Sequence, residues 1–320
     1  MLSQTSTEPA ASTGVIQSPA TPRTLRNLQL LDLNFSHHFE QPAELPAFKG
    51  GVWHGVFGLA LKEVDEAAFR CLFSTTARSQ PWRLIAPRDT ATICQAGQTV
   101  SATVTLFNEA IEYTHACAEA IVRMGTLGFG RRRSIAAVQD ISGHIGHLPK
   151  PLHALLSLPD ATQCGLLASE IFEQPTPVQN GTVGLHLVTP LSLKQDGATL
   201  RVAPCAEAVI RRVLGRLVAL VPVSGEGFLS SAEKLRLLQA AAAVQIFSSN
   251  VQWCEWERYS GRQKSTMLFG GLAGELIYVG DPHDTAVIRP WLNLAQRIGL
   301  GSKTSFGLGQ LRVADFAFDT

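Results

Sequence analysis

The sequence predicts an α+β protein whose two halves follow one plan. In the first half, strand-like and helix-like segments follow one another in the order β-α-β-β-α-β, which is the order of a ferredoxin-like domain. The second half again opens with a strand and closes with a helix and a strand. A helix, a glycine loop, a basic residue and a strand also occur together twice, around 125–133 and around 299–312. We therefore predict two tandem ferredoxin-like domains, the second with a C-terminal glycine-rich loop.

Apolar periodicity and helix caps place the elements of the first half. Residues 28–36 alternate as a strand does, and Asn108 is a suitable N-cap for a later helix. Glycines in the first helix lower its propensity but allow a sheet or a ligand to approach it closely. The predicted elements are strands at 28–36, 82–86, 99–107 and near 133–141, and helices at 50–63 and 108–124.

The second half is read in the same way. The pair Asp196-Gly197 predicts a hairpin within 190–200. Ser230 or Ser231 can cap an alanine-rich helix, and Pro290 is suited to begin the last helix, which Gly299 would end. The predicted elements are strands at 182–189, 250–257, 267–279 and 306–316, and helices at 205–220, 231–246 and 290–299.

Composition sets the domain boundaries. Residues 1–24 are rich in Ser, Thr, Pro and Ala and have neither a basic start nor an apolar core, so we expect a flexible tail rather than a signal peptide. A proline-punctuated stretch at 151–180, with a short apolar helix at 164–172, predicts a linker. The two predicted domains then cover 25–150 and 181–320.

The overall composition is that of an ordinary globular protein. The 320 residues are 45% hydrophobic and 17% charged, and the net charge of +1 neither supports nor excludes a nucleic-acid ligand. The six cysteines are widely spread and form no Cys-x-x-Cys pair, so we expect reduced thiols and a cytoplasmic location. No apolar run approaches the length of a membrane span.

The glycine loop near the C-terminus is the most informative segment. Glycine lets the backbone approach a ligand, and loops rich in amide groups form concavities for anions such as phosphate. Ser302 separates Gly301 from Lys303, which does not fit a P-loop, and the order helix, loop, strand does not fit a dinucleotide fingerprint. A grip on a phosphate backbone and a simple chain reversal both remain open. The loop residues of interest are Gly299, Gly301, Ser302, Lys303, Gly307 and Gly309.

This helix, glycine loop and strand resemble the C-terminal signature of the CRISPR-associated repeat-processing endoribonucleases. That family belongs to the repeat-associated mysterious protein superfamily, which is built from ferredoxin-like, RNA-recognition-motif-like domains. The segments 45–61, 124–133, 258–264 and 270–278 resemble the same family, so the resemblance spans about 25–316.

The resemblance implies a function. It implies a metal-independent endoribonuclease without a cofactor, which cleaves CRISPR repeat RNA by attack of a ribose 2′-hydroxyl and yields mature guide RNAs. It also implies retention of the product in an effector complex with other CRISPR subunits, and no membrane partner. One alternative is a non-catalytic RNA-binding subunit of a CRISPR ribonucleoprotein. Another is a two-domain structural protein that binds no nucleic acid.

Such a reaction needs a general base, a general acid and a cation, and histidine titrates nearest neutral pH. In the resembled family a catalytic histidine commonly lies in or near the first helix, which makes His54 the first candidate, followed by His38 and His37. Among the tyrosines, Tyr259 is the candidate, because it lies within the basic segment 258–264. The alternative for His54 is a partly buried helix residue without a catalytic role. The alternative for His37 and His38 is a pair of solvated loop residues. His144 and His147 are three residues apart, but we assign them to a surface turn rather than a metal site.

Basic residues beside the glycine loops are candidates for phosphate contacts. Three consecutive arginines on a strand would alternate faces, so at most two of them could face one ligand. Solvated charges are the alternative for each residue, and Lys49 in particular could be an ordinary surface lysine. The RNA-binding candidates besides the loop residues named above are Lys49, Arg131, Arg132, Arg133, Arg258, Arg262 and Lys264.

Overall fold

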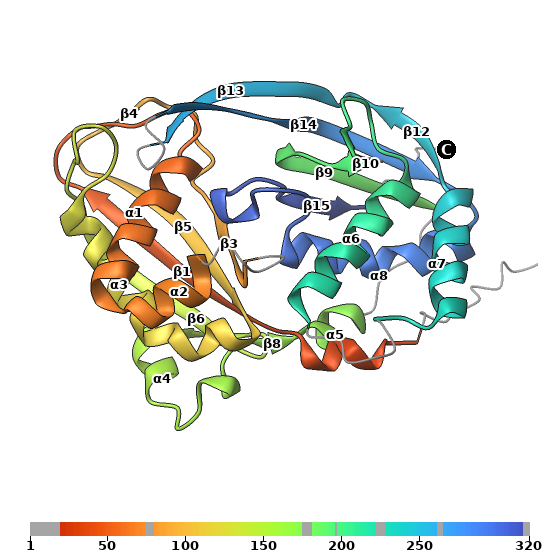
Figure 1. The fold of residues 1–320 in the computed structure, drawn as a ribbon, viewed down its shortest axis with the longest axis horizontal. Helices are drawn as coiled ribbons and strands as arrows, with labels where there is room; N and C mark the ends of the chain where they lie inside the picture. The colour runs from red at the N-terminus through yellow and green to blue at the C-terminus, as the bar shows by residue number, and fades with distance from the viewer. Residues whose placement is uncertain are drawn as a thin grey trace, which may run out of the picture.

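A computed structural model describes residues 20–73, 80–174, 181–195, 197–221, 228–260 and 265–315. The chain forms two lobes side by side, each with a sheet and a set of helices (Figure 1). The N-terminal lobe and the connector contain η1 (Arg23–Asn27), β1 (Gln29–Phe39), β2 (Ala43–Glu44), α1 (Gly50–Val64), α2 (Glu66–Phe73), β3 (Trp82–Ile85), β4 (Ile93–Cys94), β5 (Gln98–Phe107), η2 (Asn108–Tyr113), α3 (Thr114–Leu127), β6 (Ala137–Ile145), β7 (Leu148–Pro151), α4 (Leu152–Leu156), η3 (Ala161–Gln163), β8 (Leu166–Leu167) and α5 (Ala168–Phe172).

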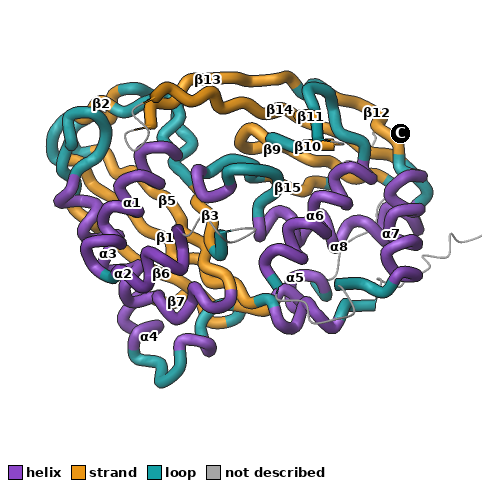
Figure 2. Tube along the Cα trace, viewed as in Figure 1, coloured by secondary structure: helices purple, strands orange, loops and turns teal. Residues whose placement is uncertain are grey.

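The C-terminal lobe has a similar composition of strands and helices (Figure 2). Its elements are β9 (Thr182–Leu191), β10 (Lys194–Gln195), β11 (Ala198–Thr199), α6 (Ala206–Leu220), α7 (Ser231–Ala243), β12 (Gln245–Ser249), β13 (Gln252–Ser260), β14 (Ser265–Val279), α8 (Pro282–Ile298), η4 (Thr304–Phe306) and β15 (Leu311–Ala314).

The two sheets have the same strand order. The N-terminal sheet runs β3-β5-β1-β6-β7, and all these pairs are antiparallel. The C-terminal sheet runs β12-β14-β9-β15. Strand β13 also pairs with β14, at residues of β14 that precede those paired with β12. In each sheet the first strand lies between two later ones, β1 between β5 and β6 and β9 between β14 and β15. This is the predicted α+β fold with two tandem ferredoxin-like units.

Alternation along the strands sends one face of each sheet into a core. In β1, Leu31, Leu33 and Phe35 are buried, and they share a core with residues of α1 and α3. The core of the C-terminal lobe is formed by α6, α7, α8 and the sheet, and it includes Trp291 and Tyr278. Apolar burial of this kind is the main favourable contribution to folding. The two cores are separate clusters, as expected for two lobes.

The lobes touch at several places. The long hairpin of β13 and β14 runs across to the N-terminal lobe in Figure 1, where Trp256 packs against Phe48 with ring centroids 4.9 Å apart. Elsewhere, Arg297 at the end of α8 donates to the carboxylate of Asp32 in β1 at 2.8 Å. These contacts fix the orientation of the C-terminal helix against the N-terminal sheet.

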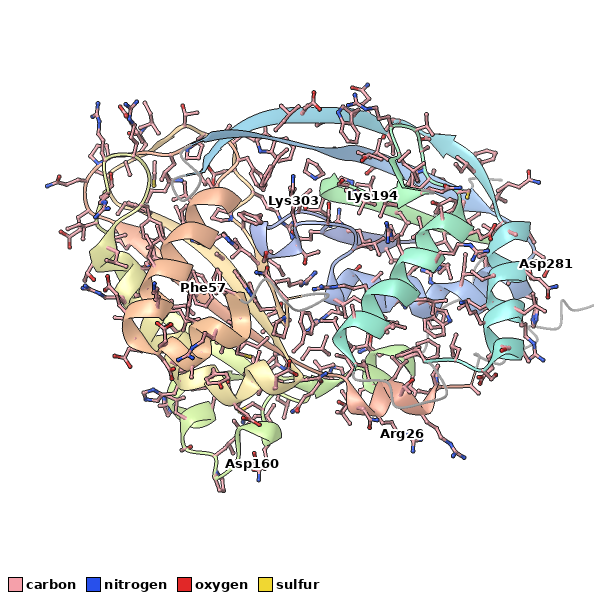
Figure 3. The ribbon with its side chains drawn as sticks, in the orientation of Figure 1. Arg26, Phe57, Asp160, Lys194, Asp281 and Lys303 are labelled. Atoms are coloured by element: carbon pink, nitrogen blue, oxygen red, sulfur yellow. The ribbon has the colours of Figure 1, made fainter. Side chains whose placement is uncertain are left out.

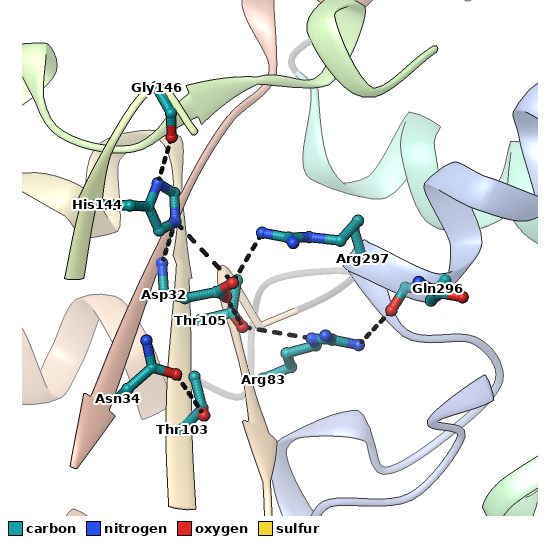
Figure 4. A network of polar contacts seen from close by, with 9 residues as sticks. All are labelled: Asp32, Asn34, Arg83, Thr103, Thr105, His144, Gly146, Gln296 and Arg297. Atoms are coloured by element: carbon teal, nitrogen blue, oxygen red, sulfur yellow. Dashed lines mark hydrogen bonds and ion pairs between the residues drawn. The ribbon is translucent and has the colours of Figure 1, made fainter. Parts of the chain in front are cut away.

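A polar network surrounds Asp32 (Figure 4). Thr105 donates to Asp32 at 2.6 Å, and Arg83 donates to the Thr105 hydroxyl and to the carbonyl of Gln296 in α8. Burial lowers the pKa of the Arg83 guanidinium to about 10, an effect that Asp32 opposes. The Asp32 amide donates to Nε2 of His144, which is a buried strand residue. The assignment of His144 to a surface turn was therefore wrong, because β6 carries it into this joint.

Several predicted elements are confirmed. The hairpin predicted within 190–200 forms by pairing of β10 with β11, and Ser230 caps α7 through a reciprocal contact with Glu233. Gly299 ends α8, as predicted. The six cysteines are free thiols. Among the described residues, no helix is long and apolar enough to cross a membrane.

Other boundaries differ from the prediction. The last helix begins at Pro282 with Asp281 as its N-cap, and Pro290 lies inside it. Both prolines follow a sequence that could start a helix, but only Asp281 supplies a side chain that accepts from an early helix amide. The helix predicted at 231–246 ends at Ala243, where β12 begins soon after, and residues 108–113 form a 3-10 turn ahead of α3.

Candidate functional site

The C-terminal glycine loop, residues 299–309, folds against itself. Hydrogen bonds join the amide of Leu300 to the carbonyl of Gly309 and the amide of Gly309 to the carbonyl of Pro190, both within 3.1 Å. The amides of Ser302, Gly307 and Leu308 also donate to carbonyl groups of the protein. Many of the backbone N–H groups that could have bound an anion therefore already donate to carbonyl groups of the protein. The loop is a braced turn from which side chains project.

This loop docks on helix α1 of the other lobe. A Cβ added to Gly50 would overlap the carbonyl oxygen of Phe306, so only glycine permits this approach. On the same side, Gly307 lies against Ala86 at the end of β3. The glycine of the first helix and the glycines of the last loop thus meet at one interface.

His54 lies at this interface. Its ring stacks on Phe306 with centroids 3.6 Å apart and an interplanar angle of 24°, and the Trp82 ring is nearly parallel to it at 5.5 Å. Its Nδ1 is 3.0 Å from the carbonyl oxygen of Ser305. A carbonyl only accepts, so Nδ1 carries the proton and, in the neutral ring, Nε2 carries the lone pair. The side chain is half-buried.

The other two candidate histidines lie in β1 rather than after it, because this strand continues to Phe39. His37 is fully buried, with Nε2 donating to the Ile121 carbonyl and its ring against Phe129. Burial lowers the pKa of His37 to about 4. His38 points to the opposite face, where its Nδ1 is 3.2 Å from the hydroxyl of Thr99. The structure therefore brings neither residue next to His54.

Lys49 is buried despite its charge. Its ammonium group donates to the carbonyls of Asp89 and Ala91 and lies 2.8 Å from the Asp89 carboxylate. These contacts satisfy all three N–H donors. Lys49 therefore braces the loop after β3, and the alternative of an ordinary surface lysine was wrong. A contact of Lys49 with RNA stays a prediction.

The three arginines lie in an exposed turn, not in a strand, because β6 begins only at Ala137. Phe129, just before them, is buried against Trp53 at 4.7 Å. Arg132 pairs with Glu44 at 3.3 Å. The argument about alternating strand faces does not apply to this turn, and the arginines project from a site anchored by an aromatic ring. They are Arg131, Arg132 and Arg133.

The remaining candidates are placed in part. Lys303 holds a left-handed backbone conformation, and its ammonium group lies 3.7 Å from the centre of the Phe269 ring. Ser302 is exposed next to it. Tyr259 and Arg258 belong to β13, but their side chains lie outside the described part of the structure, as do Arg262 and Lys264 altogether.

The sequence analysis missed Phe306 as a partner of His54. Phe306 lies 252 residues after His54, and the one signal for it in the sequence is an aromatic residue inside a glycine loop.

Within the described residues, no group of three His, Cys, Asp or Glu side chains is arranged to hold a metal ion.

Two known family models match parts of this chain. Residues 185–311 match the family model of the CRISPR-associated endoribonuclease Cas6. This match spans the C-terminal lobe, from β9 to the start of β15. Residues 28–155 match a second model, AF_1859_N, described as an N-terminal domain. The resemblance to CRISPR repeat-processing endoribonucleases is thus confirmed, and the Cas6 match supports an RNA-cleaving enzyme of CRISPR repeat processing. No curated protein sequence matches the chain significantly.

Solved structures of Cas6 proteins share the fold. Thermus thermophilus Cas6 has a TM-score of 0.58 at 15% identity, over 90% of this chain and 99% of that chain. A Cas6 product complex gives 0.58 at 16% identity, over 89% and 100%. A partial Cas6-RT-Cas1–Cas2 complex gives 0.59 at 14% identity, over 93% of this chain and 47% of that chain. At these identities the matches show the two-domain fold.

Proposed function

We propose that this protein is a metal-independent endoribonuclease that cleaves CRISPR repeat RNA through attack of a ribose 2′-hydroxyl. The observation that carries the proposal is the position of His54, at the junction between α1 and the glycine loop of the Cas6 domain. A titratable ring held at a joint between two lobes, half-buried and fixed by stacking, is suited to proton transfer. Tyr259 remains a candidate partner in the same reaction.

The hydrogen bond from Nδ1 to the Ser305 carbonyl selects the tautomer. In that tautomer Nε2 can take the proton of a 2′-hydroxyl, whose oxygen attacks the adjacent phosphorus. The bond from phosphorus to the 5′-oxygen breaks, which leaves a 2′,3′-cyclic phosphate and a 5′-hydroxyl after protonation. The protonated ring could instead serve as the acid for the leaving oxygen, and both roles use the same Nε2.

Phosphate contacts are proposed for the three exposed arginines of the first loop and for two polar side chains of the second. Arg131, Arg132 and Arg133 project from the first loop, and Ser302 and Lys303 lie on the second. Neutralising phosphates in this way would give a salt-dependent affinity. Arg258, Arg262 and Lys264 stay predictions for the hairpin that crosses to the N-terminal lobe.

Partners are proposed by analogy with the similar structures. One of them is a Cas6 product complex and another contains Cas6 with Cas1 and Cas2. We propose that this chain likewise keeps its cleaved RNA and meets other CRISPR proteins, with no membrane partner.

The stacking of His54 also favours a second candidate, a non-catalytic RNA-binding subunit. A ring packed against Phe306 and Trp82 could serve only to join the lobes. Labelled repeat RNA from a neighbouring CRISPR array, incubated with EDTA, separates these functions. Cleavage of this RNA, but not of an RNA with 2′-deoxyribose at the cleavage nucleotide, is the expected result. Tight binding of both RNAs without cleavage would instead establish the binding subunit.

Two substitutions then separate chemistry from packing at His54. His54→Asn keeps an N–H donor near the Ser305 carbonyl but has no second ring nitrogen, whereas His54→Ala removes both. We expect His54→Asn to lose cleavage by about 100-fold or more while it binds RNA like the wild type, because proton transfer typically supplies that factor. His115→Ala, at an exposed position of helix α3, is the matched control. Wild-type cleavage by His54→Asn would remove His54 from the mechanism.

A further inference from the structure

A cavity of about 280 Å³ lies between helix α6 and the glycine loop. Ser192 and Lys194, which follow β9, line one side, and Gly301 and Ser302 of the loop line another. Figure 3 labels Lys194 and Lys303 on the same side of the C-terminal lobe. The cavity thus opens beside the loop that also holds His54.

The floor of the cavity is one face of α6. Arg212, Gly215, Arg216 and Ala219 line it. Their spacing is that of residues on a single helix face. A Cβ added to Gly215 would meet no atom within 4 Å, so the small residues leave open space between the two arginines. The long basic side chains on either side and the small residues between them form a pocket of the size of a small anionic group.

The charged side chains that line this pocket are all positive. Among the lining residues, all of which the structure describes, three are basic and none is acidic. The guanidinium of Arg212 is oriented by a 2.9 Å hydrogen bond to the Lys194 carbonyl. By contrast, its neighbour Arg211 pairs with Glu207 on α6 itself. Positive side chains therefore converge on the cavity, while the next arginine along the helix is neutralised elsewhere.

Positive charge also accumulates behind the cavity. Burial and, to a smaller extent, the nearby Arg83 together lower the pKa of Arg216 to about 9, yet both residues stay charged at neutral pH. Asp32 lies close to Arg83, but its carboxylate also pairs with Arg297. Like charges at this depth destabilise one another, and an anion bound in front of them would relieve that repulsion.

We propose that this pocket binds a backbone phosphate of the RNA through Arg212, Lys194 and Arg216, with Ser302 at its rim. The proposal rests on the proposed function, because it adds a subsite to an RNA-cleaving protein. Ser302 precedes Ser305 by three residues, so their backbones are at most about 11 Å apart. A phosphate in the pocket therefore fixes the strand within a few nucleotides of His54, and it sets the register of the cleaved bond.

The test uses full-length protein and labelled repeat RNA, with affinity measured across a series of salt concentrations. Arg212→Ala should weaken binding by about 10-fold and reduce the slope of log affinity against log salt by about one phosphate equivalent. Arg211→Ala is the matched control and should leave both quantities unchanged. Equal affinities and slopes for these two variants would overturn the subsite.

A second pair of variants tests the pocket without removing a contact. Gly215→Glu places a carboxylate in the open space, and Gly215→Gln places a neutral side chain of the same size there. Because a helical glycine is replaced by a better helix former in both, the fold should be kept, which thermal unfolding would verify. Binding should be weaker with Glu than with Gln by about 10-fold or more at low salt, and the gap should shrink as salt rises. Equal binding by the two would contradict the subsite, whereas a wild-type chain that neither binds nor cleaves repeat RNA would overturn the proposed function itself.

Discussion

The turns that follow α3 and α8 begin with the same backbone geometry and then hold different parts of the molecule. Gly128 has φ 76° and ψ 159°, and Gly299 has φ 72° and ψ 155°. Each amide donates to the carbonyl four residues earlier, Met124 in one case and Ala295 in the other. The repeat seen in the sequence is therefore a repeat of helix-ending geometry.

The aromatic residue inside each turn makes the difference. Phe129 returns into its own lobe, whereas Phe306 crosses to the other lobe. Helix α1 lies between them, so that Trp53 contacts the first turn and the next residue, His54, contacts the second. Glycine permits the turn, and the aromatic side chain decides what the turn holds. The first turn stabilises a lobe, and the second couples two lobes at the proposed catalytic residue.

Removing each aromatic anchor is the strongest test of this comparison. Phe129→Ala should cost about 4 kcal/mol of unfolding free energy, because its ring is fully buried. Phe306→Ala should cost only about 1 to 2 kcal/mol, since Phe306 is half-buried, but it should slow cleavage by about 10-fold as His54 loses its stacking partner. Denaturant unfolding and single-turnover cleavage measure the two effects. Equal effects of the two variants on cleavage per folded molecule would break the comparison.

Substitution of the two capping glycines isolates the surroundings from the backbone strain. The two positions have nearly the same dihedral angles, in a region that is essentially restricted to glycine, so alanine costs about 1 to 3 kcal/mol at each. At Gly128 the new Cβ would also overlap the backbone carbonyl of Arg133, which adds about 1 to 2 kcal/mol. At Gly299 it would meet only the side chains of Arg83 and Thr304 at 3.3 Å. Gly97→Ala is the control for a glycine of positive φ, 80°, with open space around it. An equal loss for all three variants in denaturant unfolding would show that the surroundings do not matter.

Local patterns in the sequence were sufficient for the order of helices and strands along the chain, for the hairpin within 190–200 and for the glycine that ends α8. They failed where two local signals compete, as for Pro282 and Pro290, which both suit the first turn of a helix. The N-cap Asp281 was the signal that could have decided between them.

The site was less predictable than the fold, because its contacts are distant in the chain. His54 and Ser305 are 251 residues apart, and no local periodicity reports such a pair. Lys49 and His37 are of polar residue types that usually lie at the surface, yet both are buried. The loop after β3 and helix α3 supply their hydrogen-bond partners. Burial of a polar residue is a tertiary property that the sequence around it does not reveal.

The support of the first turn should depend on pH through His37, which packs against Phe129. Its pKa is about 4 in the folded protein against 6.5 for an unperturbed histidine, so the unfolded chain binds the proton first as pH falls. Stability is therefore fully present above about pH 6.5 and declines toward pH 4, by about 2 kcal/mol between pH 7 and pH 5. His37→Gln keeps a donor for the Ile121 carbonyl and should remove this part of the decline, measured by denaturant unfolding at both pH values. A variant that declines as steeply as the wild type would show that another group is responsible.

The smallest effect on stability is expected at the exposed arginines of the first turn. Arg131→Ala with Arg132→Ala removes one surface ion pair, to Glu44, and should cost less than about 0.5 kcal/mol. Arg133 is left in place, because its φ of 52° would add a backbone effect. The double variant should still weaken repeat-RNA binding severalfold and lower its salt dependence, since each phosphate contact contributes to that slope. Arg70→Ala, on exposed helix α2, is the matched control for loss of a surface charge. Unchanged RNA affinity would show that the first turn only stabilises its lobe. A large loss of stability would show that its arginines, and not Phe129 alone, hold it in place.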